Sequence, residues 1–194
     1  IGAQTNRMSH SNPNVAQVPA SYSPYGKECR ECWIVPKGYK LVGCDASGLE
    51  LRMLAHYLKD EDYTHQILDG DIHTYNMNMA GLSNREQAKT FIYAFLYGGG
   101  DVKIGQIVGG GSKQGKKIKQ TFFKSIPPLE KLITQIKKAS SRGYLKGLDG
   151  RRIRVKSEHS SPNYLLQSAG AIVMKKALVL LYDSASKEKL DFKF

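Results

Sequence analysis

One helical pattern in the middle of the chain constrains its fold more than any other feature. Arg85, Lys89 and Tyr93 recur every four residues. At this spacing they drift only about 40° per step around a helix, so they share one face. The opposite face gathers the apolar side chains of the same stretch: Ala88, Phe91, Ile92, Phe95 and Leu96. The pattern predicts a helix, ended by Gly98-Gly-Gly100, whose core face is separate from a face with two cations and an aromatic ring.

A second motif lies upstream, in Leu41-Val-Gly-Cys-Asp-Ala-Ser-Gly-Leu-Glu-Leu-Arg52. Tyr39–Asp45 predicts a strand that carries the Asp45 carboxylate at its end, and Gly48–Leu58 predicts a helix that carries Glu50. The apolar stripe of this helix is expected at Leu51, Leu54, Ala55 and Leu58. A carboxylate that can hold a divalent metal, with a helix face of Arg, Lys and Tyr, suits a nucleoside triphosphate. The metal and the cations neutralise phosphate charge, and the ring stacks on the base or the sugar.

The remaining patterns predict an α+β chain that is mostly helical. Residues 1–38 are rich in Ser, Asn and Pro, and we expect an irregular segment with a short strand near Cys32–Val35. Asp71 is the expected N-cap of a helix through Met79, and Ser83-Asn-Arg-Glu86 has the pattern of a capping box. Gly150 predicts a turn into the strand Arg152–Lys156. Further helices are expected at Asp101–Val108, Lys113–Phe123, Pro128–Ser141 and Ser161–Ser186.

The positive charge of the chain is concentrated in one block. The net charge is +12, and residues 103–156 hold 15 Lys or Arg residues but only Glu130 and Asp149 as acidic residues. A block this unbalanced favours a polyanion, either a nucleic-acid backbone or a membrane surface. Since no strongly amphipathic aromatic face accompanies it, nucleic acid is the preferred partner. The lysines expected to carry part of this affinity are Lys113, Lys116, Lys117 and Lys119.

Cysteine content and hydropathy predict a reducing compartment and no membrane partner. The three cysteines are an odd number without framework spacing, and Cys29-Arg-Glu-Cys32 has no second pair or nearby His to complete a zinc site. We expect no apolar run to approach the ~20 residues that span a bilayer. The absence of an initiator Met at Ile1 predicts a fragment of a longer protein.

Several blocks of the sequence together resemble the Pol I-like (family A) DNA polymerases, in particular the replicative polymerases of podoviral-type phages. Asp45–Arg52 is similar to the first palm motif of that family, and Arg85–Gly98 to its fingers-helix motif. The resemblance continues, in the same order along the chain, in Thr5–Pro19, Ser23–Gly26, Gly70–Thr74, Gly147–Arg151 and Leu166–Gly170. It implies the fingers and a partial palm of a right-hand polymerase: residues 1–60 as partial palm, 61–146 as fingers, and 147–194 as a return to the palm with a long helix.

The resemblance implies a DNA-templated DNA polymerase with two Mg²⁺ ions, primer-template DNA and dNTPs as partners, and a bacterial host cytoplasm, during infection or lysogeny, as its location. Asp45 would bridge the two ions, and the backbone carbonyl of Ala46 would also ligate metal. Glu50 would crowd the sugar 2′ position and hydrogen-bond Tyr93, so that deoxyribonucleotides are selected. A processivity factor is compatible with the family but cannot be read from the residues.

For the triphosphate, the resemblance implies Arg85, Lys89 and His73 as ligands, with Lys89 also the general acid that protonates the leaving pyrophosphate. The Tyr93 phenol would replace the missing 3′-hydroxyl of a dideoxynucleotide. Ala94 departs from the Gly that many relatives have there.

On the DNA side, Tyr97 and Gly98 would form the floor under the templating base. Arg7, Asn163 and Gln167 would touch the minor groove at the primer terminus, where such contacts check geometry without reading sequence. His159 stands where many relatives carry Arg, so no role transfers to it.

Two-metal phosphoryl transfer needs a second carboxylate, which the family supplies from a His-Asp-Glu hairpin that is absent here. We therefore expect the chain as given to be inactive on its own, and a nucleotide- and DNA-binding module without catalysis is the alternative function. A remote third hypothesis is a P-loop ATPase, from Gly110-Gly-Ser-Lys-Gln-Gly-Lys-Lys117. A P-loop, however, has Ser or Thr where Lys117 stands.

Overall fold

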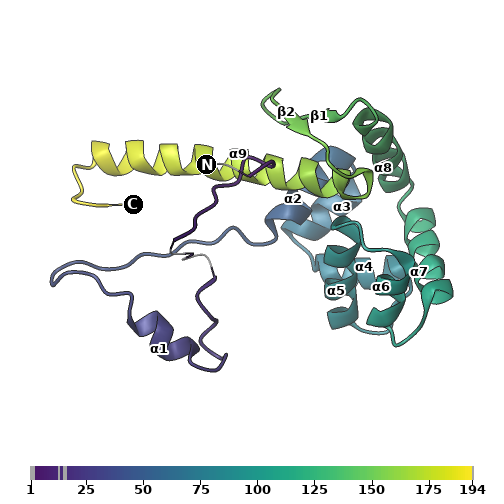
Figure 1. Cartoon of the computed structure of the whole chain (residues 1–194), viewed down its shortest axis with the longest axis horizontal. Coiled ribbons are helices and arrows are strands. Elements are labelled where there is room, and N and C mark those ends of the chain that lie inside the picture. Colours follow the sequence, from purple (N-terminus) through teal and green to yellow (C-terminus); the bar gives the residue numbers. More distant parts are fainter. Residues whose placement is uncertain (1–2, 13, 15–16, 194) are drawn as a thin grey trace. The chain divides into compact units, whose positions relative to one another are not determined.

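Residues 3–12, 14 and 17–193 are described by the structure, a computed structural model, and they divide into two units (Figure 1). The first unit contains residues 3 and 8–47, and the second contains Gln4–Arg7 and the chain from Gly48 onward. Ile1, Pro13, Val15, Ala16 and Phe194, which belong to the segments named above, lie outside the described residues.

The first unit is largely irregular and contains one short helix, α1 (Gly26–Glu31), which no sequence pattern predicted. Its start is fixed by a close approach, because a Cβ on Gly26 would lie 1.8 Å from the carbonyl oxygen of Ala20. Arg30 Nε donates to the Pro19 carbonyl oxygen at 2.8 Å, which ties the helix to the preceding turn. Cys29, Cys32 and Cys44 are all free thiols.

The strands predicted near Cys32–Val35 and at Tyr39–Asp45 are wrong. Residues 33–36 and 39–46 are irregular, and the side chains of Leu41 and Val42 are exposed. An apolar run favours a strand only if a neighbouring segment accepts and donates its ladder hydrogen bonds. The sheet of the described chain has two strands, and neither of these segments is one of them.

Helices form most of the second unit, as predicted (Figure 1). One of them, α3, was not predicted, although the Asp60 carboxylate marks its start by accepting from Tyr63 N at 2.8 Å. The other boundaries agree with the predicted ranges to within about two residues, which is the usual uncertainty of helix ends. In chain order the helices are α2 (Leu49–Leu58), α3 (Glu61–Leu68), α4 (Ile72–Ala80), α5 (Arg85–Leu96), α6 (Asp101–Ile107), α7 (Ser112–Ser125), α8 (Pro127–Ser140) and α9 (Ser161–Lys187).

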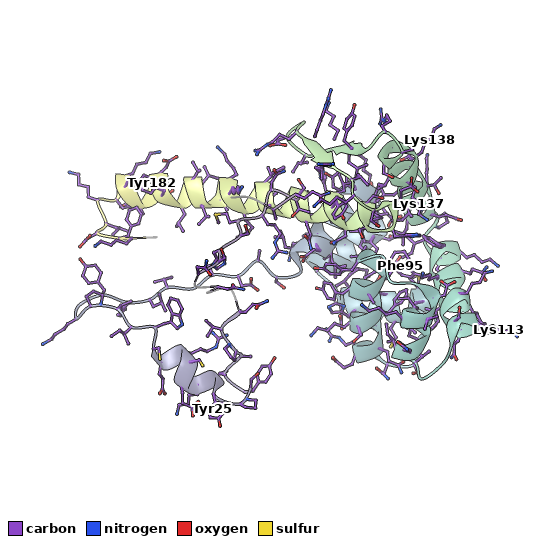
Figure 2. All side chains as sticks on the ribbon, viewed as in Figure 1. Tyr25, Phe95, Lys113, Lys137, Lys138 and Tyr182 are labelled. Atoms are coloured by element: carbon purple, nitrogen blue, oxygen red, sulfur yellow. The ribbon has the colours of Figure 1, made fainter. Side chains whose placement is uncertain are left out.

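The main core of this unit is formed by buried side chains of α2, α5, α7 and α8, with single residues from α3, α4, α6 and α9. The predicted apolar stripe of α2 is confirmed, since all four of its residues are buried. Phe122 of α7 is fully buried and meets two rings of α5 edge-on, Phe91 at 5.1 Å and Phe95 at 5.5 Å between centroids. Phe95 is labelled in Figure 2. Edge-to-face contacts add to the free energy of burying these rings. This aromatic cluster holds the apolar face of α5 against α7.

The predicted capping box at the start of α5 needs a correction. The N-cap is Asn84, whose side-chain oxygen accepts from Gln87 N at 2.9 Å. Ser83 lies one residue earlier, and its hydroxyl donates to Gln87 Oε1 at 2.8 Å. Both residue types cap helices well, and Asn84 has the extended backbone that the position requires.

A smaller core lies where α8 and α9 meet a two-stranded antiparallel sheet. The strands are β1 (Tyr144–Lys146) and β2 (Arg152–Arg154), and Leu145 pairs with Ile153. These two side chains are buried with Ile136 of α8 and Leu165 of α9. The strand β2 was predicted, although its prediction extended two residues further, to Lys156, whereas β1 was not predicted. A short 3₁₀ turn, η2 (Glu158–Ser160), then leads into α9.

The long helix α9 has two different halves. Residues 161–170 are mostly buried and pack against α2 and α8, whereas residues 177–184 are exposed. Contrary to the sequence-based expectation, the segment Glu158–Lys187 is long and apolar enough to cross a membrane by length and composition. A core helix of a soluble protein passes the same test of length and composition.

Candidate functional site

The polar face of α5 is formed as the sequence predicted. Arg85 and Lys89 are exposed and Tyr93 is partly buried, while Ala88, Phe91 and Ile92 on the other side are completely buried. The core face differs from the prediction in one detail, because Ala94 is buried and Phe95 only partly so. Two cations and a phenol ring are thus held on a helix that cannot rotate without exposing its core side chains.

Arg85 is held by the carboxylate of Asp71, the N-cap of α4. Arg85 Nε donates to Asp71 Oδ2 at 2.7 Å, and Nη2 donates to Oδ1 at 3.2 Å. The same carboxylate accepts from the backbone N–H of His73 at 3.1 Å and of Thr74 at 3.4 Å. Arg85 and the Thr74 hydroxyl hold the pKa of Asp71 well below its usual range, so this carboxyl stays charged. The sequence predicted the cap but not the ion pair.

His73 lies beside the polar face of α5. Its ring centroid is 6.4 Å from that of Tyr93, and its Nδ1 atom is buried without a hydrogen-bond partner. Burial lowers the pKa of His73, and the positive charges of Arg85 and Lys89 lower it further. The imidazole is therefore neutral at pH 7 in the free protein, with one ring nitrogen unsatisfied. The structure brings together the three predicted triphosphate ligands.

Tyr93 also lies close enough to Glu50 of α2 for the Glu50 charge to affect its pKa. Partial burial raises the pKa of Tyr93, and the negative charge of Glu50 and the nearby Tyr97 raise it further. No hydrogen bond between Glu50 and Tyr93 is present in the described chain. In this structure Glu50 therefore acts on Tyr93 through its charge, and the hydrogen bond between them stays a prediction.

The end of α5 contacts the start of α9. Gln167 Nε2 donates to the Tyr97 hydroxyl at 3.4 Å, so two residues predicted to bind DNA touch each other. Gly98 follows with φ +77°, and a Cβ there would lie 2.5 Å from the carbonyl oxygen of His159. Gly98 thus packs directly on the backbone of η2, a contact that no sequence pattern indicated.

The segment that carries Arg7 is anchored on the same region. Asn6 Nδ2 donates to Ser168 Oγ at 3.1 Å, next to Gln167 on α9. Gln4 Nε2 donates to the Arg154 carbonyl oxygen of β2, and Thr5 is buried. Arg7 itself is exposed at the end of this anchored segment. Asn163 lies one helical turn before Gln167, so both amides share a face of α9.

The predicted metal ligands Asp45 and Ala46 belong to the first unit, and their role stays a prediction. Asp45 is exposed, as are most residues around it. A carboxylate and a backbone carbonyl are suitable ligands for a hard cation. Within the described residues there is no group of three or more His, Cys, Asp or Glu that could hold a metal ion. Asp45 and Ala46 alone supply fewer donors than a metal site needs, so their assignment as metal ligands stays a prediction.

The basic block extends over α6, α7, α8 and the β1–β2 hairpin. Figure 2 shows Lys113 at the start of α7, and Lys137 and Lys138 near the end of α8. Lys113, Lys116 and Lys117 are exposed. Lys119 differs from them, because its Nζ lies 2.9 Å from Asp101 Oδ1 and its side chain is only 22% exposed. Three of the four predicted lysines are therefore available to a polyanion, and Lys119 is engaged in the fold.

The P-loop-like stretch has a structural purpose instead. Gly110 and Gly111 lie in the loop between α6 and α7, and Ser112 to Lys117 form the first turns of α7, whereas a P-loop connects a strand to a helix. A Cβ on Gly115 would lie 1.9 Å from the Asp101 carbonyl oxygen, and one on Gly105 would lie 2.1 Å from the Gly111 carbonyl oxygen. These glycines let the two helices pack closely. The geometry does not fit an ATPase phosphate loop.

Comparison with known proteins gives a consistent result. The whole chain, residues 1–194, matches DNA polymerase family A. It is 45% identical over 200 residues to the DNA-directed DNA polymerases of Escherichia phage T7 and Enterobacteria phage T3, which covers 90% of this chain and 28% of each relative. It is 32% identical over 200 residues to the thermostable DNA polymerase I of Thermus aquaticus, covering 92% of this chain and 24% of that protein. The chain thus spans less than a third of the length of these relatives.

A solved structure shows the same fold. The POL domain of Pol1 from M. smegmatis, in complex with DNA primer-template and dNTP, superimposes with a TM-score of 0.83. The match covers 97% of this chain and 37% of that chain, at 20% sequence identity. Since the family matches over the full length and the fold agrees, the chain belongs to DNA polymerase family A.

Proposed function

We propose that this chain forms the fingers and part of the palm of a DNA-templated DNA polymerase, and that the polar face of α5 binds the incoming dNTP. One observation carries the proposal. Arg85, Lys89 and Tyr93 share an exposed helix face, and His73 lies beside it with an unsatisfied ring nitrogen. The names of the phage relatives, DNA-directed DNA polymerases, support it.

The side chains of this face suit the parts of a nucleoside triphosphate. Arg85 would bind phosphate oxygens through guanidinium N–H groups, a geometry that favours bidentate contacts. Lys89 and His73 would add donors to the outer phosphates. Tyr93 would stack on the nucleoside, and Glu50 would leave no room or hydrogen-bond partner for a ribose 2′-hydroxyl.

In nucleotidyl transfer, the primer 3′-oxygen bonds to the α-phosphorus while the bond between that phosphorus and the leaving pyrophosphate breaks. Lys89 would give a proton to the leaving pyrophosphate as general acid, which typically contributes 10²–10⁴-fold to the rate. Arg85 would stabilise charge that develops on the phosphate oxygens.

Divalent metal use is expected of a family A polymerase, and we propose Mg²⁺, with two ions in the intact enzyme. Asp45 and the Ala46 carbonyl would hold metal, which when bound activates the primer hydroxyl and neutralises phosphate charge. A second carboxylate is needed to bridge two ions. We propose that this carboxylate lies in a part of the polymerase beyond residues 1–194.

The chain would make two kinds of contact with DNA, one to the phosphates and one to the bases and the minor groove. Exposed lysines of the basic block would bind phosphates without reading sequence. Tyr97 and Gly98 would form the floor under the templating base, and Arg7, Asn163 and Gln167 would test the minor groove at the primer terminus. The anchoring of the Arg7 segment beside Gln167 supports the assignment of these two residues to one surface.

For the domain organisation we propose residues 1–60 as partial palm, 61–146 as fingers and 147–194 as the return to the palm. The cytoplasm of a bacterial host is the proposed location, and a processivity factor is a proposed additional partner. We propose as the alternative function for residues 1–194 alone the binding of nucleotide and DNA without catalysis, since the described residues hold no group of three or more His, Cys, Asp or Glu that could bind a metal ion.

The test combines two measurements on one purified sample of residues 1–194. A fluorescent dNTP titration should show binding that Arg85→Ala weakens by about tenfold or more, because charge-assisted hydrogen bonds are removed. Lys187→Ala, at the exposed end of α9 and outside the basic block, is the matched control and should leave affinity unchanged. No dNTP binding by the wild-type chain would overturn the proposal.

A primer-extension gel on the same sample should show no template-dependent product. Robust extension by residues 1–194 alone would mean that a second metal-binding carboxylate comes from an unrecognised position within them, and would overturn the proposed division between binding and catalysis.

A further inference from the structure

The Asp71 carboxylate connects two elements of the nucleotide site that are separate in sequence and near in space. It caps α4, which places the His73 backbone, and it holds the guanidinium of Arg85 on α5 by two hydrogen bonds. Its Oδ2 atom also accepts from the Thr74 hydroxyl at 2.8 Å. Both oxygens are therefore saturated with donors, and the carboxylate has a single well-defined orientation.

The geometry of the ion pair leaves part of Arg85 free. A guanidinium carries five N–H donors, and Asp71 engages only the edge formed by Nε and Nη2. The Nη1 atom points elsewhere, and the carboxylate nearest to it is Glu86, at 3.6 Å. Because this ion pair with Glu86 is longer than a hydrogen bond, a phosphate oxygen would bind the edge formed by Nη1 and the second Nη2 proton while the contact with Asp71 remains.

We propose that Asp71 is a positioning residue for the nucleotide: it holds Arg85 by one edge and starts α4 so that Arg85 and His73 form a preformed triphosphate clamp. This inference rests on the proposed function. An unrestrained arginine loses side-chain entropy when it binds a ligand, and a partner that fixes its rotamer beforehand reduces that cost.

Simple electrostatics predicts the opposite effect of Asp71 on triphosphate binding. Asp71 is a negative charge beside a site for a polyanion, so its removal should tighten triphosphate binding if it acts only through charge. The same result is expected if Asp71 occupies Arg85 as a competitor that the nucleotide must displace. Weaker binding after neutralisation of Asp71 is expected only if the orientation of Arg85 matters more than the charge.

The test uses Asp71→Asn in residues 1–194. Asn is as good an N-cap as Asp, so α4 keeps its start, but the amide presents one acceptor oxygen and cannot receive both hydrogen bonds from Arg85. Asp60→Asn is the matched control, because Asp60 caps α3 in the same way and has no arginine partner in the described chain. Glu86→Gln removes a carboxylate near Arg85 without disturbing the clamp, and measures the effect of charge alone.

We expect Asp71→Asn to weaken fluorescent dNTP binding by about fivefold, the upper range for an exposed ion pair. Asp60→Asn should leave the Kd unchanged, and Glu86→Gln should leave it unchanged or lower it. In an Arg85→Ala background, Asp71→Asn should have no further effect, since the residue through which it acts is gone. If Asp71→Asn fails to fold, Asp71→Ser provides the same comparison, because Ser also caps helices.

The outcomes separate the two proposals. If the wild-type chain binds dNTP and Arg85→Ala weakens binding, but Asp71→Asn leaves binding unchanged or tightens it, only the positioning role is overturned. The same conclusion follows if Asp71→Asn weakens binding equally with and without Arg85. If the wild-type chain does not bind dNTP, the proposed function fails and the positioning role fails with it.

Discussion

Gln167 Nε2 donates a hydrogen bond to the hydroxyl of Tyr97 at 3.4 Å, across 70 residues of sequence. The contact joins the C-terminal end of α5 to the first turns of α9. One residue further, Gly98 packs on the backbone of His159 in the turn that precedes α9. The end of the helix that carries the nucleotide ligands and the helix that carries Asn163 and Gln167 are thus fixed to each other.

Gly98→Ala should therefore destabilise the second unit. The backbone at Gly98 has φ +77°, and a Cβ would lie 2.5 Å from a carbonyl oxygen, so the substitution combines an unfavourable conformation with a clash. We expect a decrease of about 2–4 kcal/mol in the free energy of unfolding, measured as a lower Tm. Gly100→Ala is the control, because Gly100 has φ −67° and a Cβ added there would have no atom within 4 Å. Equal Tm values for the two variants would contradict the assignment.

The exposed lysines of α7 should set the salt dependence of DNA binding. Replacing Lys113, Lys116 and Lys117 by Gln should reduce the slope of log affinity against log salt by about 0.9 for each duplex phosphate that is no longer neutralised. Lys119→Gln should leave the slope unchanged, because Asp101 already neutralises this side chain. A fluorescence anisotropy titration at several salt concentrations measures both. A larger effect from Lys119 than from the other three would place the DNA on a different face of α7.

His73 should make nucleotide binding depend on pH. Its pKa is lowered in the free protein by burial and by Arg85 and Lys89, against the smaller opposing effect of Asp71 and Glu86. A bound phosphate would raise the pKa, so the complex binds more protons than the free chain and affinity should increase as the pH falls from about 8 to about 6. The terminal phosphate of the nucleotide also titrates in this range, with a pKa of about 6. The comparison is therefore with His73→Gln, whose pH profile should be flatter. Identical profiles would exclude His73 from the phosphate site.

Lys89→Ala in the intact polymerase should affect the chemical step more than binding. A general acid acts mainly in the transition state, so kcat should fall by about 10²-fold or more while the dNTP Kd changes much less. Single-turnover kinetics separate the two quantities, with Lys187→Ala, at the exposed end of α9 and outside the basic block, as the control. A raised KM with unchanged kcat would show that Lys89 only binds.

The parts of the fold that could be predicted from sequence are those set by local periodicity. The alternation of Phe91 and Ile92 with Arg85 and Lys89 around one helix is a property of a single segment, and the structure follows it. The N-cap at Asp71 could also be predicted, because its hydrogen bonds reach only two and three residues along the chain. The predicted strand at Tyr39–Asp45 was wrong because a strand depends on a partner, and its apolar side chains do not specify one.

The candidate site was only partly predictable for the same reason. Residue types and spacing on α5 indicated phosphate binding, and the resemblance added His73 and Glu50. The ion pair between Asp71 and Arg85 joins two helices, and the contact between Gly98 and His159 joins two loops. Neither contact produces a periodic pattern in the sequence from which it could be predicted. Lys119 could not be separated from its neighbours by sequence, because its partner Asp101 lies on another helix.

The division of α9 into a buried and an exposed half has a consequence for amide hydrogen exchange. Residues 161–170 are held by packing against α2 and α8, whereas residues 177–184 form helical hydrogen bonds with almost no tertiary support. Isolated helical turns open readily in water, and protection against exchange follows the free energy of local opening. Deuterium uptake along this one continuous helix should therefore be slow near Leu165, Leu166 and Ala169 and fast near Leu180 and Leu181. Anything that binds the exposed half would be detected as the disappearance of that gradient.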